Sequence, residues 1–177
     1  MNSALDSADM FVDKGKLLTV QERGETTVFE AKRGILWRKP PVVLINDQTV
    51  SSGEILAGAL KDSAGARLVG QRGFGKGRIQ VLYHLGEGMG GMMISTGTFQ
   101  RPNGQTVDVH DLPRDSPDAG IHPDVGLEVK VPEAELKVWR DFNQLLDGSF
   151  LLTPEERVPP TPDRVLEKSL ELLGRRG

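Results

Sequence analysis

The chain has 177 residues, with 22 Lys and Arg against 25 Asp and Glu and a formal net charge of −3. Its length fits one domain or one domain with an extension, and a hydrophobic fraction of 37% with 21 glycines is enough for a globular core. The composition offers no basic field for a phosphate backbone and no apolar run that could cross a bilayer, which argues against nucleic acid as a partner and against an integral membrane segment. The absence of cysteine excludes disulfides, thiolate catalysis and Cys-based zinc sites, and the N-terminus lacks the basic and apolar blocks of a signal peptide.

The first part of the chain alternates between helix-like and strand-like patterns. Apolar residues recur at helical spacing over 3–13, which predicts a helix that Gly15 ends. Two β-rich segments, 17–20 and 26–29, flank a Glu-Arg-Gly-Glu turn and predict a hairpin. The uninterrupted apolar run Val42–Ile45 predicts a strand buried on both faces, as in a parallel sheet.

A second helix and another strand follow that run. Residues 51–64 place their apolar side chains on one helical face, and residues 67–70 form a short strand pattern. This strand–helix–strand order predicts a βαβ unit with a right-handed crossover, and therefore an α/β fold. The patterns further along predict strands at 79–85 and 92–98, a surface loop at 108–124, and helices at 132–146 and 163–173.

The segment 49–54 is the most informative part of the chain for function. Ser51 comes just after a buried strand and at the start of a helix, where α/β folds place their sites. A serine there suits a nucleophile, since it is exposed and a free N–H group of the helix start can hold an oxyanion. The Ser-x-x-Glu pattern also matches a capping box, in which Ser51 caps the helix and Glu54 reaches back. From the local pattern alone, capping is the commoner role for serine at this position.

A nucleophilic serine needs a base. The three histidines lie in no context that matches a catalytic triad or a metal site, being scattered at His84, His110 and His122. Lys76 is the better candidate, because the bare backbone of Gly75 and Gly77 on either side of it allows a side chain to approach another segment closely. A lysine acts as a base only when it is neutral, which a water-poor pocket favours. Taken alone, a lysine in a glycine turn is most often a solvated loop residue.

The same region imitates a nucleotide site. Gly70, Gly75 and Lys76 match the opening of a phosphate-binding loop. The next position should be Ser or Thr to bind Mg²⁺, but it is Gly77, and the residues that follow predict a strand where such a loop opens a helix. Nucleotide binding is therefore disfavoured by both composition and context.

Several stretches of the chain form an ordered set of motifs. They read P-V-V-L-I-N at 41–46, V-S-S-G-E-I-L-A-G-A-L at 50–60, L-V-G at 68–70, F-G-K-G-R-I-Q at 74–80, T-F-Q-R-P-N-G at 98–104 and G-I-H-P-D-V at 120–125. Over residues 3–130 this set resembles the carboxy-terminal processing peptidases, or tail-specific serine proteases. The serine and lysine of that family lie 25 positions apart, which selects Ser51 over Ser52 as the partner of Lys76. Gln80 matches the family's glutamine four positions after the lysine.

The resemblance implies a crotonase/Clp-protease-like α/β core with βαβ units and a mixed sheet, followed by C-terminal helices. It implies a serine endopeptidase in which Ser51 is the nucleophile and neutral Lys76 the base. Gln80 would orient the lysine, and the backbone N–H of Ser52 would be one oxyanion donor. No cofactor and no metal is expected. The expected partners are protein or peptide substrates with unstructured, apolar C-terminal tails, which would be cut outside the cytoplasm. The resemblance leaves open whether the chain forms a homo-oligomer.

The chain also departs from the family pattern. The family usually has Ser-Ala-Ser-Glu, and Gly53 here loosens the first helical turn without touching the nucleophile. A PDZ domain and a glycine-rich stretch that precede the matched region in the family have no counterpart in these 177 residues. We therefore expect residues 1–130 to be an N-terminally truncated catalytic core and residues 131–177 a C-terminal helical extension, with weak activity for this chain alone.

Two other classes of function stay open at this point. The core could be a non-catalytic binding or assembly module with a vestigial dyad, because folds outlive their activities. It could also be another α/β acyl-transfer enzyme, because similar cores act on other acyl substrates. A fluorophosphonate probe separates the first from a peptidase, and product analysis on peptides against thioesters separates the second.

Overall fold

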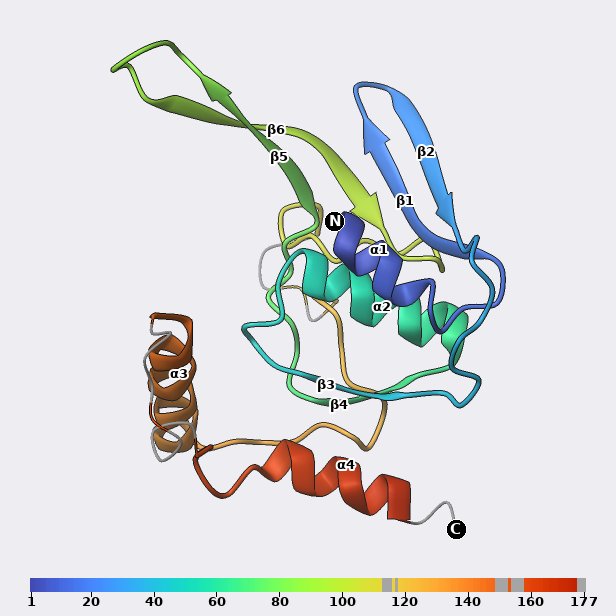
Figure 1. Cartoon of the computed structure of the whole chain (residues 1–177), viewed down its shortest axis with the longest axis vertical. Helices are drawn as coiled ribbons and strands as arrows, with labels where there is room; N and C mark the ends of the chain where they lie inside the picture. The colour runs from blue at the N-terminus through green and yellow to red at the C-terminus, as the bar shows by residue number, and fades with distance from the viewer. Residues whose placement is uncertain (113–115, 117, 149–152, 154–157, 175–177) are drawn as a thin grey trace.

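The computed structural model describes residues 1–112, 116, 118–148, 153 and 158–174. Its elements confirm the predicted α/β core followed by helices (Figure 1). In chain order they are α1 (Asn2–Ala8), β1 (Lys16–Glu22), β2 (Glu25–Glu30), β3 (Val42–Ile45), α2 (Ser52–Ala64), β4 (Arg67–Gly70), β5 (Arg78–His84), β6 (Gly91–Gln100), α3 (Glu133–Gly148) and α4 (Arg164–Gly174).

Two sheets lie on opposite sides of the helix pair α1–α2 (Figure 1). One is antiparallel with strand order β2-β1-β6-β5, and the other is the parallel pair β3-β4. The helix α2 buries side chains toward both sheets, which is why its sequence is apolar around most of its circumference. Toward the antiparallel sheet it packs Ile55 among Leu18, Val20 and Phe99, and toward the parallel pair it packs Ala57 and Leu60 among Ile45, Leu68 and Ile121.

The predicted βαβ unit is present, but the prediction for its first strand is wrong in one respect. Val42 pairs with Arg67 and Ile45 with Gly70 in the parallel register that the unit requires. Only Ile45 is buried, whereas Leu44 is 42% exposed. In the described part of the chain β3 has β4 as its one hydrogen-bonded neighbour, so it is an edge strand. The elements packed on its faces leave the Leu44 side chain partly open to solvent.

Two other predictions differ from the structure. The helix predicted over 3–13 ends at Ala8, because Asp9 turns its buried carboxylate to the backbone N–H of Lys32 at 2.7 Å, and turns continue to Val12. The stretch 108–124 has no helix or strand among its described residues, and residues 113–115 and 117 lie outside the description. It is not a surface loop throughout, since Asp108 and Ile121 are at most 1% exposed.

The C-terminal helices attach to the outer side of the β3-β4 pair. α4 lies beneath these strands (Figure 1), and Ser169 on its inner face is 2% exposed. α3 is linked to the loop after β3 by an ion pair of 2.7 Å between Arg140 and Asp47, and to α4 by Arg164, which donates two hydrogen bonds to Glu135. None of the described helices is long and apolar enough to span a membrane.

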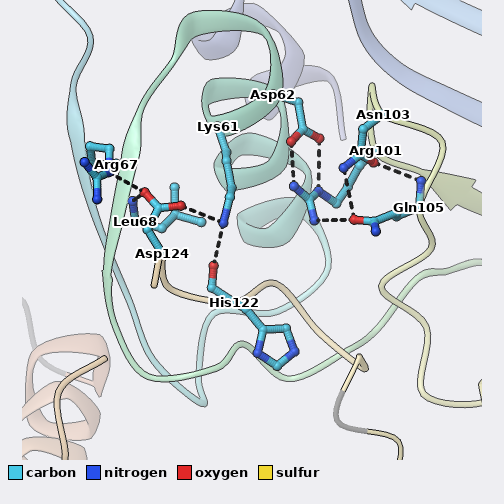
Figure 2. Close-up of polar contacts among 9 residues, drawn as sticks. All are labelled: Lys61, Asp62, Arg67, Leu68, Arg101, Asn103, Gln105, His122 and Asp124. Atoms are coloured by element: carbon cyan, nitrogen blue, oxygen red, sulfur yellow. Dashed lines mark hydrogen bonds and ion pairs between the residues drawn. The ribbon is translucent and has the colours of Figure 1, made fainter. Parts of the chain in front are cut away.

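A buried ion pair joins α2 to the turn after β6 (Figure 2). Arg101 donates to both carboxylate oxygens of Asp62, at 3.1 and 2.6 Å, and both side chains are about nine-tenths buried. Gly58 makes room for this arginine, because a Cβ there would stand 3.0 Å from the Cγ of Arg101. The bidentate geometry fixes the angle at which the turn leaves the sheet.

A second polar cluster, around Asp124, ties three segments together (Figure 2). The carboxylate accepts hydrogen bonds from Lys61 of α2 at 2.9 Å, and from the Arg67 side chain at 2.7 Å and the Leu68 N–H at 3.2 Å in β4. Burial raises the pKa of Asp124, but the hydrogen bonds from Lys61, Arg67 and Leu68 outweigh it and hold the pKa below the usual 3.8. The charged form of Asp124 is therefore part of the folded state.

We expect the Asp124 cluster to make stability fall in acid. A carboxyl whose pKa is lower in the folded chain contributes stability above its unfolded pKa, and this contribution is lost as the pH falls from about 4 through the folded-state pKa. Asp124→Asn should lower the free energy of unfolding by about 1–2 kcal/mol at neutral pH. This is the lower end of the range for hydrogen bonds to charged groups, because the Arg67 side chain is partly exposed. Urea unfolding between pH 3 and 7 should show a flatter acid slope for the variant.

The matched control is Asp13→Asn, since Asp13 is exposed and makes no ion pair within the described residues. This variant should follow the unsubstituted chain at every pH. If stability falls equally steeply in acid for Asp124→Asn and for the unsubstituted chain, protonation of Asp124 is not a cause of that fall.

Candidate active site

Ser51 stands at the point where the chain turns from β3 into α2. It precedes the first residue of α2 and is half-buried. Its φ of 54° and ψ of −109° lie near the first central position of a type II′ turn, a conformation that glycine ordinarily takes. A non-glycine residue in such a conformation costs on the order of 1–3 kcal/mol and is concentrated at functional sites. The backbone of Ser51 therefore makes a sharp, strained turn between the strand β3 and the helix α2.

The predicted capping box is formed, with Ser51 at the N-cap of α2 and Glu54 three residues on. Glu54 reaches back and accepts the Ser51 N–H on its Oε2 atom at 3.1 Å. Since the side chain of Glu54 is fully buried, its carboxylate requires partners on both oxygens. It finds them outside its own helix.

The Glu54 carboxylate binds three separate segments of the chain. Oε2 also accepts the Lys76 N–H at 2.9 Å, while Oε1 accepts the N–H groups of Gly75 at 2.9 Å and Ile121 at 3.3 Å. One oxygen thus holds the backbones of Ser51 and Lys76, and their nitrogen atoms lie within about 6 Å of each other. The structure brings the two residues selected by the 25-position spacing to one place.

The segment that carries Lys76 is extended and alternates buried glycines with outward side chains. Gly73, Gly75 and Gly77 are buried, Phe74 is 59% exposed and Lys76 is half-buried. A Cβ on Gly75 would stand 2.5 Å from a Val109 methyl carbon and one on Gly77 would stand 2.7 Å from the Asp108 Cβ. The backbone on both sides of Lys76 therefore packs closely against residues 108 and 109, and only glycine permits this approach.

A second buried carboxylate holds this segment from its other end. Asp108, 1% exposed, accepts the Gly77 N–H at 3.0 Å and the Nε of Arg78 at 3.3 Å. It also accepts the His110 N–H at 2.7 Å. Lys76 therefore lies between two buried acids, Glu54 on its N-terminal side and Asp108 on its C-terminal side, which fix the backbone on both sides of it.

The remaining predicted residues lie near this centre. Ser52 is the first residue of α2, and its backbone N–H has no acceptor in the described part of the chain, as an oxyanion donor requires. Gln80 lies on β5 opposite Ser95 and is exposed; the hydrogen bonds of the described residues include none between its side chain and Lys76. The segment after Lys76 continues as the strand β5, so the phosphate-loop pattern has no helix to open.

Neither acid was predicted to act on the lysine segment. The capping pattern accounts for one of the four donors to Glu54, and the other three come from residues 21 to 67 positions away. The alternating glycines at 73, 75 and 77 are the signal that something packs against that backbone, but they do not say what. A cavity of about 250 Å³ near the C-terminal helices, lined by Asn46, Trp139 and Val165 among others, includes neither Ser51 nor Lys76.

Known proteins share these features of sequence and fold. The family model "Peptidase family S41" matches residues 1–127. A carboxy-terminal-processing protease of Bartonella bacilliformis is 35% identical over 136 residues, covering 75% of this chain and 29% of the relative. A carboxyl-terminal-processing protease of Synechocystis sp. is 36% identical over 129 residues, covering 72% of this chain and 28% of the relative. The chain thus spans less than a third of the length of these relatives.

Solved structures agree with the sequence comparison. The photosystem II D1 C-terminal processing protease superposes with a TM-score of 0.61 at 30% identity, over 73% of this chain and 31% of that one. An S41 protease structure from Bacteroides fragilis, at 10% identity and with the same TM-score of 0.61, shows a shared fold over 99% of this chain and 42% of its own. The serine and lysine segments tied together by Glu54 lie inside the matched region, and the chain belongs to peptidase family S41.

Proposed function

We propose that this chain is a serine peptidase that cleaves peptide bonds with Ser51 as nucleophile and Lys76 as general base. The observation that carries the proposal is the shared Glu54 oxygen, which holds the backbones of both residues. Three further facts support it: the strained backbone of Ser51, the free N–H of Ser52, and the membership of a peptidase family.

The proposed mechanism is an acyl transfer in two halves. Neutral Lys76 takes the hydroxyl proton of Ser51 as the oxygen attacks the peptide carbonyl carbon, and the Ser52 N–H stabilises the oxyanion. Lys76 then gives that proton to the leaving amine, the C–N bond breaks and an acyl-serine ester remains. Water attacks the ester with Lys76 again as base, which releases the new carboxylate and restores Ser51. Gln80 would orient Lys76 after a rotamer change, since its side chain is exposed.

We propose that the substrates are polypeptides with unstructured, apolar C-terminal tails. The family resemblance supports this choice, and the relatives are carboxy-terminal-processing proteases. We propose an extracytoplasmic location for this chain on the ground of the family resemblance. We also propose that residues 1–130 form the catalytic unit and residues 131–177 an extension.

The first prediction concerns the two reacting residues. Ser51→Ala and Lys76→Ala should each lower peptide hydrolysis by about 10⁴-fold or more, because each removes a group that acts in the bond-making step. Lys76→Arg should be equally inactive, since an arginine stays protonated and cannot act as a base. Gln80→Ala should lower the rate of hydrolysis less, because it removes the group that orients the lysine and leaves the base in place. The measurement is hydrolysis of an unstructured apolar peptide together with fluorophosphonate labelling of the serine.

Ser52→Ala is the matched control for Ser51→Ala. It removes a hydroxyl one residue away but keeps the backbone N–H, so activity should stay within about threefold of the unsubstituted chain. An active Lys76→Arg enzyme would rule out the general-base role. A chain that folds but is never labelled by the probe would favour the non-catalytic alternative.

The second prediction concerns Glu54. Glu54→Gln keeps the size of the side chain but turns an NH₂ group toward two backbone donors, which should displace Ser51 and Lys76 from each other. A misplacement of about 1 Å costs on the order of 10²-fold in rate, and the lost charged acceptor destabilises the fold by at least about 2 kcal/mol. Labelling rates and urea midpoints should both fall. The control, Glu128→Gln, changes an exposed glutamate and should alter neither.

The third prediction concerns the chain as it stands. The family resemblance implies a second oxyanion donor in a glycine-rich stretch that residues 1–177 do not contain, and one missing donor costs on the order of 10²–10³ in rate. We expect Ser51 to react with a fluorophosphonate while peptide turnover stays slow. A longer version of the chain that includes the glycine-rich stretch and turns over substrate within tenfold of residues 1–177 would contradict this placement of the oxyanion hole.

A further inference from the structure

The strands β5 and β6 extend beyond the sheet as a two-stranded ribbon. β1 pairs with β6 only from Gly97 to Gln100, whereas β5 pairs with β6 out to His84 and Gly91. From residue 80 to residue 95, which we call the arm, the two strands have no third strand beside them in the described part of the chain. Figure 1 shows this ribbon projecting away from the rest of the molecule. An isolated ribbon of this kind is marginal in water.

The arm is apolar on both of its faces. One face carries the cross-strand pairs Val81–Ile94 and Tyr83–Met92, and the opposite face carries Leu82–Met93. Eight large apolar side chains are exposed by 38–67%: Val81, Leu82, Tyr83, Leu85, Met89, Met92, Met93 and Ile94. Glu87 at the turn is the one acidic residue of the arm, and the arm has no Lys or Arg. A continuous exposed apolar surface of this kind is a binding surface.

The outer edge of β5 is open to another strand. Its backbone N–H and C=O groups that point away from β6 face no neighbour in the described structure, since β5 is the last strand of its sheet. Edge strands are ordinarily protected from further pairing by lysine, proline or inward charges, and residues 79–85 contain none of these. An extended polypeptide can therefore add to this edge through main-chain hydrogen bonds, with its side chains in contact with the arm.

The position of the arm relative to the candidate site points to one kind of occupant. β5 begins two residues after Lys76, whose backbone shares the Glu54 oxygen with Ser51. A strand added along β5 therefore leads into the dyad. Three of the five methionines of the chain lie on the arm, at Met89, Met92 and Met93, and flexible methionine side chains adapt to apolar partners of different sequence. This composition suits varied unfolded segments better than one fixed protein surface.

We propose that the arm is the substrate-holding surface: an extended, uncharged, apolar polypeptide segment adds as a strand to the free edge of β5 and is led along it to Ser51. The proposal rests on the proposed function and names how the substrate of that site is held. The face that carries Leu82 and Met93 makes the main side-chain contact. The opposite face is partly occupied, since Arg23 donates to the Tyr83 hydroxyl at 3.1 Å.

The test measures binding in the Ser51→Ala chain, so that hydrolysis does not interfere. The probes are a fluorescein-labelled 15-residue unstructured apolar peptide, the same peptide with alternate backbone nitrogens methylated, and a Gly/Ser peptide of equal length. We expect the apolar peptide to bind, and Leu82→Thr with Met93→Thr to weaken binding at least tenfold. N-methylation should also weaken it at least tenfold, and the Gly/Ser peptide should not bind. The control, Leu170→Thr, changes a leucine of α4 that is 57% exposed and should leave the affinity within twofold.

Two further measurements separate this proposal from the proposed function. Fluorophosphonate labelling of Ser51 in the Leu82→Thr, Met93→Thr chain should match the unsubstituted chain, because the dyad lies outside the arm. Loss of labelling in both chains with peptide binding intact would overturn the peptidase and leave the binding surface in place. Equal peptide affinity with and without the arm substitutions would overturn the arm as the holding surface. A dimer in sedimentation velocity that the arm substitutions dissociate would also overturn it, since the surface would then cover a second copy.

Discussion

A single buried carboxylate organises the functional end of this molecule. Glu54 accepts hydrogen bonds from N–H groups at the start of α2, in the segment that carries Lys76 and at Ile121 in the stretch 108–124. Each hydrogen bond to a charged acceptor contributes about 1.5–3 kcal/mol, so four of them outweigh the strain of about 1–3 kcal/mol in the Ser51 backbone. Burying this acid would be unfavourable without those donors, and the donors would be unsatisfied without the acid. The geometry of the site and the stability of the fold therefore depend on the same contacts.

Other carboxylates of the core, farther from Ser51 along the chain, also join segments that are distant in sequence. Asp108 fixes the far end of the lysine segment, Asp62 fixes the turn after β6 through Arg101, and Asp124 fixes β4 to α2. In each case a carboxylate from one segment receives donors from another that is far away in sequence. The described structure leaves one buried side-chain polar atom without a partner, the Thr96 hydroxyl. The loops around the site are thus held by specific hydrogen bonds as well as by apolar packing.

Much of the local structure could be predicted from the sequence, because periodicity and capping are local properties. The helix of residues 51–64, the strand of residues 67–70 and the Ser51–Glu54 capping box are found within a residue of their predicted places. The exposure of Leu44 could not be predicted, because an apolar run does not say which elements pack on each face of its strand. The family spacing of Ser51 and Lys76 indicated that the two residues lie close together, but not that Glu54 joins their backbones, since three of the four donors to Glu54 come from distant segments. Burial within residues 108–124 was missed because Pro and Asp dominate that stretch while its few apolar residues point inward.

The attachment of α3 gives the molecule a gradient of local stability. None of the α3 side chains that the structure describes is buried, and the helix is held by ion pairs such as Arg140–Asp47 at the surface. Such pairs are screened by salt and contribute little, whereas α2 is packed against both sheets. The amides of α3 should consequently exchange with solvent through an opening of that helix alone, and faster as ionic strength rises. Those of α2 exchange only when the whole core opens. Because Asp47 lies four residues before Ser51, each opening of α3 also releases the loop that leads to Ser51.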